Sequence, residues 1–178
     1  MFGGSFDPPH LGHQSIVQEA LNDLDISLLL VVPAYQNPFK PSSLASAKQR
    51  LNWCHTLFSK EEKVKVEAYE IEVGKSTSTW QSIQHFNLQY DVKYLIIGSD
   101  NLATLENWYR FEWLNQHITW VIATREGYPV DTSGLKTWRV LQCHTPISSS
   151  VIKTAEDLHY IDEKIKISVK EILKDKSQ

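Results

Sequence analysis

Short apolar runs that alternate with amphipathic segments constrain the fold of this chain more than any other feature. Continuous apolar runs at 27–32 (SLLLVV), 94–97 (YLII) and 118–123 (ITWVIA) predict strands that are buried on both faces of a parallel sheet. The segment 64–71 alternates more and 138–141 is short, so we place both toward the sheet edges. This alternation predicts an α/β protein with a doubly wound parallel sheet.

The segments between these runs have the spacing of amphipathic helices. Ser46 and Ser78 each precede one of them, and a glutamine follows each serine three residues later, which is the pattern of a capping box. A last amphipathic segment near the C-terminus has lysines that mostly face water. We expect helices at 11–24, 47–58 and 79–90, a helix from about 149 to 158, and a final one around Ile165, Val169 and Ile172.

The length and composition indicate a single globular domain over 1–178. The chain has 178 residues, of which 42% are hydrophobic and 22% are charged, which is typical of a folded domain. Eighteen Lys and Arg against 21 Asp and Glu give a net charge of −3. This balance excludes a generally basic nucleic-acid binder, although it is compatible with a local basic pocket.

The sequence also argues against a membrane-spanning or exported protein. The longest apolar run, 28–34, is too short to cross a bilayer, and 3–13 lacks the charged and apolar regions of a signal peptide. Cys54 and Cys143 have no metal-ligand spacing, so we interpret them as reduced thiols. We therefore expect a cytoplasmic protein with no membrane partner.

The segment 2–13, FGGSFDPPHLGH, is the most informative motif of the chain. Gly3 and Gly4 have no Cβ, so a phosphate can approach the backbone closely. Ser5 and Phe6 follow, and their N–H groups can donate to such a phosphate. The Asp-Pro-Pro sequence that comes next restricts the backbone and predicts a rigid loop.

Two histidines lie where the helix after this loop is expected to begin. His10 and His13 are three residues apart, so both rings point to one side if this turn is helical. The N–H groups and the dipole of a helix N-terminus favour an anion there. A metal pair is the alternative, but neither a cysteine nor a third histidine lies nearby in the sequence. We interpret the histidines as donors to a polyphosphate.

A second motif with phosphate-binding chemistry lies at 146–153, PISSSVIK. Its serines 148–150 are typical N-cap residues, and their hydroxyls and the helix N–H groups can hold a phosphate oxygen. Lys153 can neutralise the charge of that phosphate. Three serines before a helix are more often a simple cap, so this motif gains weight only together with the first one.

Together the two motifs resemble the nucleotidylyltransferase superfamily, which transfers a nucleotide monophosphate from ATP or CTP and releases pyrophosphate. GGSFDPPHLGH resembles its HxGH signature, and PISSSVIK resembles its ISSTxxR/K motif, with Lys153 where the family often has Arg. Lysine keeps the charge but loses the bidentate fork. The resemblance implies a Rossmann-like fold. It implies His10 and His13 as catalytic residues, and ATP binding by Gly4, Ser5, Phe6, Gly12, Gly98, Asp100, Ile147, Ser148, Ser149 and Lys153.

Four middle segments resemble the bacterial nicotinate mononucleotide adenylyltransferases within this superfamily. They are PAYQNPFKP (33–41), KSTSTWQSI (75–83), IIGSDNLATLENWYRFEWL (96–114) and TREGYP (124–129). The family's SYT stretch is here Thr77-Ser78-Thr79, so its aromatic residue is missing. The resemblance implies a mononucleotide site made of Lys40, Thr79, Trp80, Trp108 and Arg125.

Each of these residues also has a physical interpretation. Thr79 and Trp80 open a helix, so their N–H groups can receive the nicotinate carboxylate. Trp108 can stack on the flat pyridine ring, although a core position is the simpler alternative. Asp100 follows a strand, where a carboxylate commonly accepts ribose hydroxyls, and it can also cap the next helix. Candidate partners for a phosphate or a carboxylate are Lys40, Arg50 and Arg125.

The reaction implied is nicotinate mononucleotide plus ATP giving deamido-NAD and pyrophosphate. The phosphate nucleophile is already ionised at neutral pH, so no general base is needed. Mg²⁺ is expected to come with ATP, without a metal site on the protein. The alternatives are phosphopantetheine adenylyltransferase, an enzyme that accepts the nicotinamide mononucleotide, and a catalytically silent nucleotide-binding regulator. An aminoacyl-tRNA synthetase fragment is less compatible, because no KMSKS-like stretch is present.

The start of the chain departs from the family pattern. Only Met1 and Phe2 precede the glycine pair, whereas the family has a full strand there. We expect this strand at the centre of the sheet, and we interpret the start of the chain as shortened.

Overall fold

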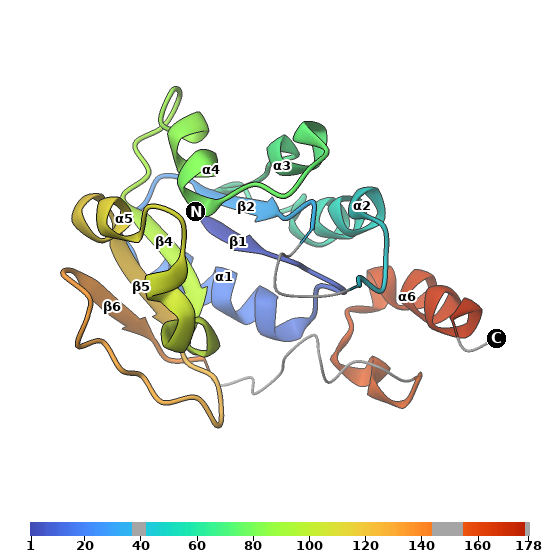
Figure 1. Ribbon diagram of the computed structural model, residues 1–178. Helices are drawn as coiled ribbons and strands as arrows, with labels where there is room; N and C mark the ends of the chain where they lie inside the picture. The colour runs from blue at the N-terminus through green and yellow to red at the C-terminus, as the bar shows by residue number, and fades with distance from the viewer. Residues whose placement is uncertain (37–41, 144–154, 177–178) are drawn as a thin grey trace.

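The computed structural model describes residues 1–36, 42–143 and 155–176, and it arranges them around one parallel sheet (Figure 1). The strand order is β3-β2-β1-β4-β5-β6. This order confirms the doubly wound α/β fold, with the two expected edge segments at the two edges. The strands are β1 (Phe2–Gly4), β2 (Leu29–Pro33), β3 (Val64–Val66), β4 (Tyr94–Gly98), β5 (Thr119–Ala123) and β6 (Trp138–Leu141).

Helices cover both faces of this sheet. One face packs against α1, α2 and α6, and the other packs against α4, α5 and the 3-10 helix η1. In Figure 1, α6 lies beside α2 at the end of the molecule that carries the C-terminus. The bounds are α1 (Leu11–Asp23), α2 (Ala47–Phe58), α3 (Tyr69–Val73), α4 (Thr79–Phe86), η1 (Ser99–Asn107), α5 (Phe111–His117), η2 (Ala155–Tyr160) and α6 (Glu163–Asp175).

The strands β2, β4 and β5 are mostly apolar because they are buried on both sides. Along β2, Leu29 and Val31 face the core under α1 and α2, whereas Leu30 and Val32 face the core under α4 and α5. Successive side chains of a strand point to opposite faces, so a strand covered on both sides needs no polar alternation. This two-sided burial explains why continuous apolar runs predicted the strands correctly.

Two expectations about local structure need correction. The segment 64–71 was expected as one strand, but the strand ends at Val66 and Tyr69–Val73 form the helix α3. Gly74 ends this helix in the left-handed region, with a φ of 69°. The helix expected at 79–90 ends at Phe86. The helix expected from about 149 begins outside the described residues, and 155–160 forms the 3-10 helix η2.

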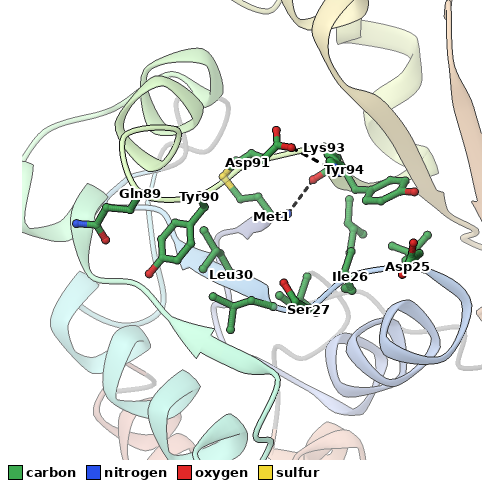
Figure 2. A pocket seen from close by; sticks show the side chains of 15 residues that line it. Met1, Asp25, Ile26, Ser27, Leu30, Gln89, Tyr90, Asp91, Lys93 and Tyr94 are labelled. Atoms are coloured by element: carbon green, nitrogen blue, oxygen red, sulfur yellow. Dashed lines mark hydrogen bonds and ion pairs between the residues drawn. The ribbon is translucent and has the colours of Figure 1, made fainter.

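The short strand β1 lies at the centre of the sheet, as expected. Phe2 pairs with Val31 on one side and with Ile96 on the other. The Met1 nitrogen donates to the Tyr94 carbonyl at 2.8 Å, which continues the pairing of β1 with β4 (Figure 2).

A cavity of about 340 Å³ surrounds Met1 between the start of β2 and the start of β4 (Figure 2). It lies at the amino ends of the strands, whereas ligands of open parallel sheets bind at the carboxyl ends. The carboxyl ends of the strands are therefore the expected place of the active site. Within the described ranges no helix has both the length and the apolar character needed to cross a membrane.

Candidate active site

A larger cavity, of about 550 Å³, opens at the carboxyl ends of the strands. It lies where β1 and β4 are neighbours, which is the point at which the strand order reverses and ligands bind. Its walls come from the loops after β1, β2 and β4 and from the start of α4. The residues that line the cavity include Gly4, Ser5, Ala34, Gln36, Glu70, Ser76, Thr77, Ser78, Thr79, Gln81, Asn101, Asn107, Trp108 and Tyr109.

The loop after β1 folds tightly because Phe6 turns back into the core. The Phe6 ring is fully buried, and a Cβ at Gly4 would lie 3.2 Å from it. Phe6 has a φ of 48°, which is uncommon for a residue with a side chain. A side chain at position 4 would therefore press against the buried Phe6 ring.

A buried arginine of α2 holds this loop through hydrogen bonds to backbone carbonyls. Arg50 is 1% exposed, and its guanidinium donates to the carbonyls of Ser5 at 2.5 Å and Tyr35 at 2.6 Å. The sequence offered Arg50 as a phosphate or carboxylate partner, but both of its Nη atoms bind backbone carbonyls. In the structure Arg50 is a clamp between the loops after β1 and β2.

Asp7 ties the same loop to the segment before α2. Its carboxylate accepts the backbone N–H groups of Leu44, at 2.6 Å, and Ala45, at 2.9 Å. Leu44 and Ala45 follow Asp7 by 37 and 38 positions in the sequence. The loop that was expected to be rigid is thus held by partners that no local motif indicates.

The two histidines meet at the start of α1. Helix α1 begins at Leu11 with His10 at its N-cap, and the ring centroids of His10 and His13 are 3.8 Å apart. This confirms that both rings lie on one side. Both residues are buried, at 1% and 7% exposed, and Gly12 is buried between them in the first turn.

The hydrogen bond of His13 defines which of its nitrogens donates. The His10 backbone N–H donates to His13 Nδ1 at 3.2 Å, so Nδ1 is an acceptor. In the neutral ring the proton then lies on Nε2, which is the donor. The Phe6 ring packs against His13 with centroids 4.8 Å apart and fixes the orientation of the imidazole.

Asp100 and Arg125 were predicted for different substrates, but the structure pairs them. Arg125 Nη1 donates to Asp100 Oδ2 at 2.7 Å, and Asn101 Nδ2 lies 3.3 Å from Asp100 Oδ1. The Asp100 carboxylate folds back over Gly98, where any Cβ would collide with it. Arg125 and Asp100 lie at the same edge of the sheet as the cavity, after β5 and β4 respectively.

The first turn of α4 lines the end of the cavity at which the mononucleotide was expected, and we call it the acceptor end. Ser78 and Gln81 form the predicted capping box: Gln81 N–H donates to Ser78 Oγ, and Ser78 N–H donates to Gln81 Oε1. The N–H groups of Thr79 and Trp80 lie between these two and take no part in the box. They are thus suited to receive an anion at a helix N-terminus.

Trp108 lines the cavity and also touches the core. Its ring packs edge-on against Trp120, with centroids 6.3 Å apart, so Trp108 is part of the core packing, and its stacking on a pyridine ring stays a prediction. Tyr109 beside it is 56% exposed at the cavity mouth, and the sequence analysis did not single it out. The Trp80 ring packs against Tyr109 and Trp113, at 5.7 and 6.3 Å between centroids.

Glu70 is a second cavity residue that sequence reasoning missed. It comes from α3 and is only 7% exposed, and its Oε1 accepts a hydrogen bond from Ser82 Oγ at 2.6 Å. Burial raises the pKa of Glu70 to about 7, against the opposing effects of Ser82 and Arg50. Its only sequence signal was a carboxylate inside a segment that was interpreted as a strand.

Several predicted site residues lie outside the described ranges. These are Lys40, Ile147, Ser148, Ser149 and Lys153. Their predicted roles therefore stay predictions. Within the described ranges, no three His, Cys, Asp or Glu side chains gather as a possible metal site.

Comparison with known families matches this geometry to a class of protein. Residues 1–155 match the model of the cytidylyltransferase-like family, which is more than half of the chain. The parallel sheet, the glycine loop and the paired histidines at the reversal point thus define a nucleotidyltransferase.

Individual relatives narrow the class to one family. A probable nicotinate-nucleotide adenylyltransferase of a Sulfurovum species is 59% identical over 178 residues, which cover 100% of this chain and 95% of the relative. A protein of the same name from a Nitratiruptor species is 40% identical over 163 residues, covering 90% of each chain. This chain belongs to the nicotinate-nucleotide adenylyltransferase family.

Solved structures agree on the fold. The nicotinic acid mononucleotide adenylyltransferase of Plasmodium falciparum, complexed with NaAD, superposes with a TM-score of 0.70 over 99% of this chain and 94% of that chain. The sequence identity is 19%, so this likeness shows the Rossmann-like nucleotidyltransferase fold and not the substrate.

Proposed function

We propose that this enzyme transfers the adenylyl group of ATP to nicotinate mononucleotide, giving nicotinate adenine dinucleotide and pyrophosphate. The observation that carries the proposal is one cavity that is lined both by the Gly4–Ser5 loop and by the first turn of α4. The Gly4–Ser5 loop lines its phosphate end, and Phe6 of the same loop packs against His13 with ring centroids 4.8 Å apart. Thr79 of the α4 N-terminus and Trp108 line its acceptor end. Membership of the family named above supports the same reaction.

The chemistry needs positioning and charge stabilisation more than proton transfer. An oxygen of the mononucleotide phosphate attacks the α-phosphorus of ATP and forms a new P–O bond. The bond from the α-phosphorus to the bridging oxygen breaks, and pyrophosphate leaves with the electron pair. Two anions must be held in line, and the negative charge on the leaving group must be stabilised. No general base is assigned to this step.

The phosphate end of the cavity is suited to this task. We assign His10 and His13 as the catalytic donors, because His13 presents its Nε2 proton and both rings sit at the positive end of α1. Gly4, Ser5, Phe6 and Gly12 provide the surrounding backbone. On the ATP side we assign Gly98 and Asp100, together with Ile147, Ser148, Ser149 and Lys153.

The acceptor end is suited to a flat, anionic ring. The Thr79 and Trp80 N–H groups would receive the nicotinate carboxylate, and Trp108 would stack against the pyridine. Lys40 belongs to this proposed set as well. Arg125 was expected here, but its ion pair leads us to assign it the orientation of Asp100.

The family generally uses a divalent metal with ATP, and we propose Mg²⁺ for this enzyme. Mg²⁺ prefers phosphate oxygens and water and keeps much of its hydration shell. It is expected to arrive bound to the triphosphate, where it would neutralise charge on the leaving pyrophosphate.

We further propose that 1–178 forms one domain and that the reaction takes place in the cytoplasm. A single sheet holds both halves of the site, and Cys54 and Cys143 are free thiols. The part of the site that the structure describes supports nucleotides as its partners.

The proposal is tested by pyrophosphate release with ATP and Mg²⁺, measured in parallel on three acceptors. Nicotinate mononucleotide should give a much higher kcat/KM than nicotinamide mononucleotide or phosphopantetheine. Turnover of phosphopantetheine alone would keep the phosphate chemistry and overturn the acceptor site. ATP binding without turnover of any acceptor would favour a silent nucleotide-binding regulator.

A further inference from the structure

Helices α3 and α4 are joined by a buried hydrogen bond at the edge of the cavity. Ser82 is fully buried on α4, and its Oγ donates to Glu70 Oε1 at 2.6 Å. This O···O distance is typical of a hydroxyl that donates to a carboxylate. Glu70 itself lines the cavity, so the bond lies directly behind the substrate space.

The position of Ser82 on α4 gives this bond its importance. Ser82 follows Thr79 by three residues, so the two side chains lie on the same side of the helix, one turn apart. The first turn of α4 holds the N–H groups assigned to the nicotinate carboxylate. A contact that fixes Ser82 therefore also fixes the position of those N–H donors along the helix axis and their rotation about it.

The connection between α3 and α4 cannot fix the donors by itself. Gly74 leaves α3 in the left-handed region, and residues 74–76 are exposed. The side-chain hydrogen bonds of this loop are local: Thr77 Oγ1 donates to the Lys75 carbonyl, and Ser78 bonds to Gln81. The position of the first turn of α4 thus depends on contacts made by the body of the helix.

A second contact between the two helices lies beside this hydrogen bond. The rings of Tyr69 and His85 are stacked, with centroids 3.8 Å apart and an angle of 8° between their planes. His85 lies one turn beyond Ser82, farther from the α4 N-terminus. This stack offers a matched control, because it joins the same helices but lines no part of the cavity described above.

The carboxyl group at position 70 carries a cost in stability. Its burial raises the pKa of Glu70 to about 7, because the charged form is poorly solvated there. Arg50 is the nearby cation, and it is itself committed to the Ser5 and Tyr35 carbonyls. A buried polar group of this kind is expected to be well bonded, and Ser82 is the partner that the structure shows.

We propose that Glu70 is a positioning residue for the mononucleotide, which acts through Ser82 to hold the α4 N-terminus at the acceptor end of the cavity. This inference rests on the proposed function and deepens it. Glu70 needs no contact with the reacting atoms. Its removal should weaken mononucleotide binding while leaving the ATP end of the cavity unchanged.

The test compares steady-state kinetics of four variants of the full chain with the wild type. Glu70→Ala removes the acceptor, Ser82→Ala removes the donor, Glu70→Gln keeps a carbonyl acceptor, and His85→Ala breaks only the stack. Glu70→Ala and Ser82→Ala should raise the KM for nicotinate mononucleotide about tenfold, with the KM for ATP changed less than about twofold. Glu70→Gln should restore most of the affinity, and His85→Ala should leave both KM values near the wild type.

The outcomes separate this inference from the proposed function. A wild type that does not turn over nicotinate mononucleotide would overturn both. With wild-type turnover intact, an unchanged KM for the mononucleotide in folded Ser82→Ala would overturn the inference alone. So would an equal rise in both KM values, because a general loosening of the fold predicts that result. If Glu70→Ala fails to fold, Ser82→Ala and Glu70→Gln decide the question.

Discussion

The two ends of the cavity are held in different ways. At the phosphate end, the loop after β1 makes hydrogen bonds with partners from distant parts of the chain. At the acceptor end, the backbone N–H groups that cap the start of α4 are bonded within the same turn. Arg50 binds the Ser5 carbonyl, and Asp7 binds the N–H groups of Leu44 and Ala45. At the other end, the helix start is capped by Ser78 and Gln81, three residues apart.

The difference fits the two tasks of the cavity. Charge stabilisation needs donors that are preorganised before the reaction, since reorganisation would add to the barrier. In the proposed site, recognition of the acceptor depends on the α4 N-terminus and on the indole ring of Trp108. The phosphate end should therefore carry most of the effect on kcat, and the acceptor end most of the effect on KM.

The largest effect is expected for His13→Ala, which removes a proposed catalytic donor. It should lower kcat by at least about a hundredfold, because the Nε2 proton no longer stabilises the phosphate charge. Pyrophosphate release under saturating substrates measures it. His55→Ala changes an exposed histidine of α2 and is the control. Wild-type turnover in His13→Ala would remove the assigned role.

Arg50→Met should destabilise the protein by about 2 to 3 kcal/mol, because the carbonyls of Ser5 and Tyr35 lose their buried donors. Chemical denaturation measures the change in the free energy of unfolding. Lys48→Met, an exposed position on the same helix, should change it little. Equal stability of the two variants would show that Arg50 does not clamp the loop.

Glu70→Gln should change the dependence of stability on pH. The pKa of Glu70 rises from 4.5 to about 7 on folding, so between these values the native state binds more protons than the unfolded state. Stability contributed by this group is present below pH 4.5 and is lost as the pH rises through 7. The variant should therefore gain about 2 kcal/mol relative to the wild type between pH 5 and pH 8. Chemical denaturation at both pH values measures this gain. The prediction is wrong if the difference in unfolding free energy between Glu70→Gln and the wild type is the same at pH 5 and pH 8.

The smallest effect is expected for Trp108→Ala, since it removes one stacking surface. The KM for nicotinate mononucleotide should rise about tenfold while kcat changes less. Trp138→Ala, at a half-exposed edge position on β6, is the control. A fall in kcat with an unchanged KM would place Trp108 at the phosphate end and weaken the comparison between the two ends.

Much of the fold could be predicted because the strands are buried on both faces. Continuous apolar runs indicated β2, β4 and β5, and serine caps located the starts of α2 and α4 within a residue. The helix α3 was missed because the alternation of 64–71 continues past Val66, and only the later Gly74 signals a helix end. Local pattern cannot distinguish a short strand followed by a single helical turn from one longer strand.

The candidate site was predictable where its chemistry is local in sequence. The spacing of His10 and His13 and the capping box of α4 both indicated the observed geometry. The Arg125–Asp100 pair and the Glu70–Ser82 bond were not predictable, because the partners are 25 and 12 residues apart and meet only in the folded chain. The same holds for Arg50, whose partners are carbonyls that carry no sequence signal.

The most direct test of the account is a crystal structure with nicotinate adenine dinucleotide bound. We predict that the nicotinate carboxylate lies at the N–H groups of Thr79 and Trp80, with the pyridine against Trp108. The bridging phosphates should lie within hydrogen-bonding distance of His10 and His13. A pyridine ring outside the cavity at the α4 N-terminus, or phosphates away from both histidines, would contradict the account.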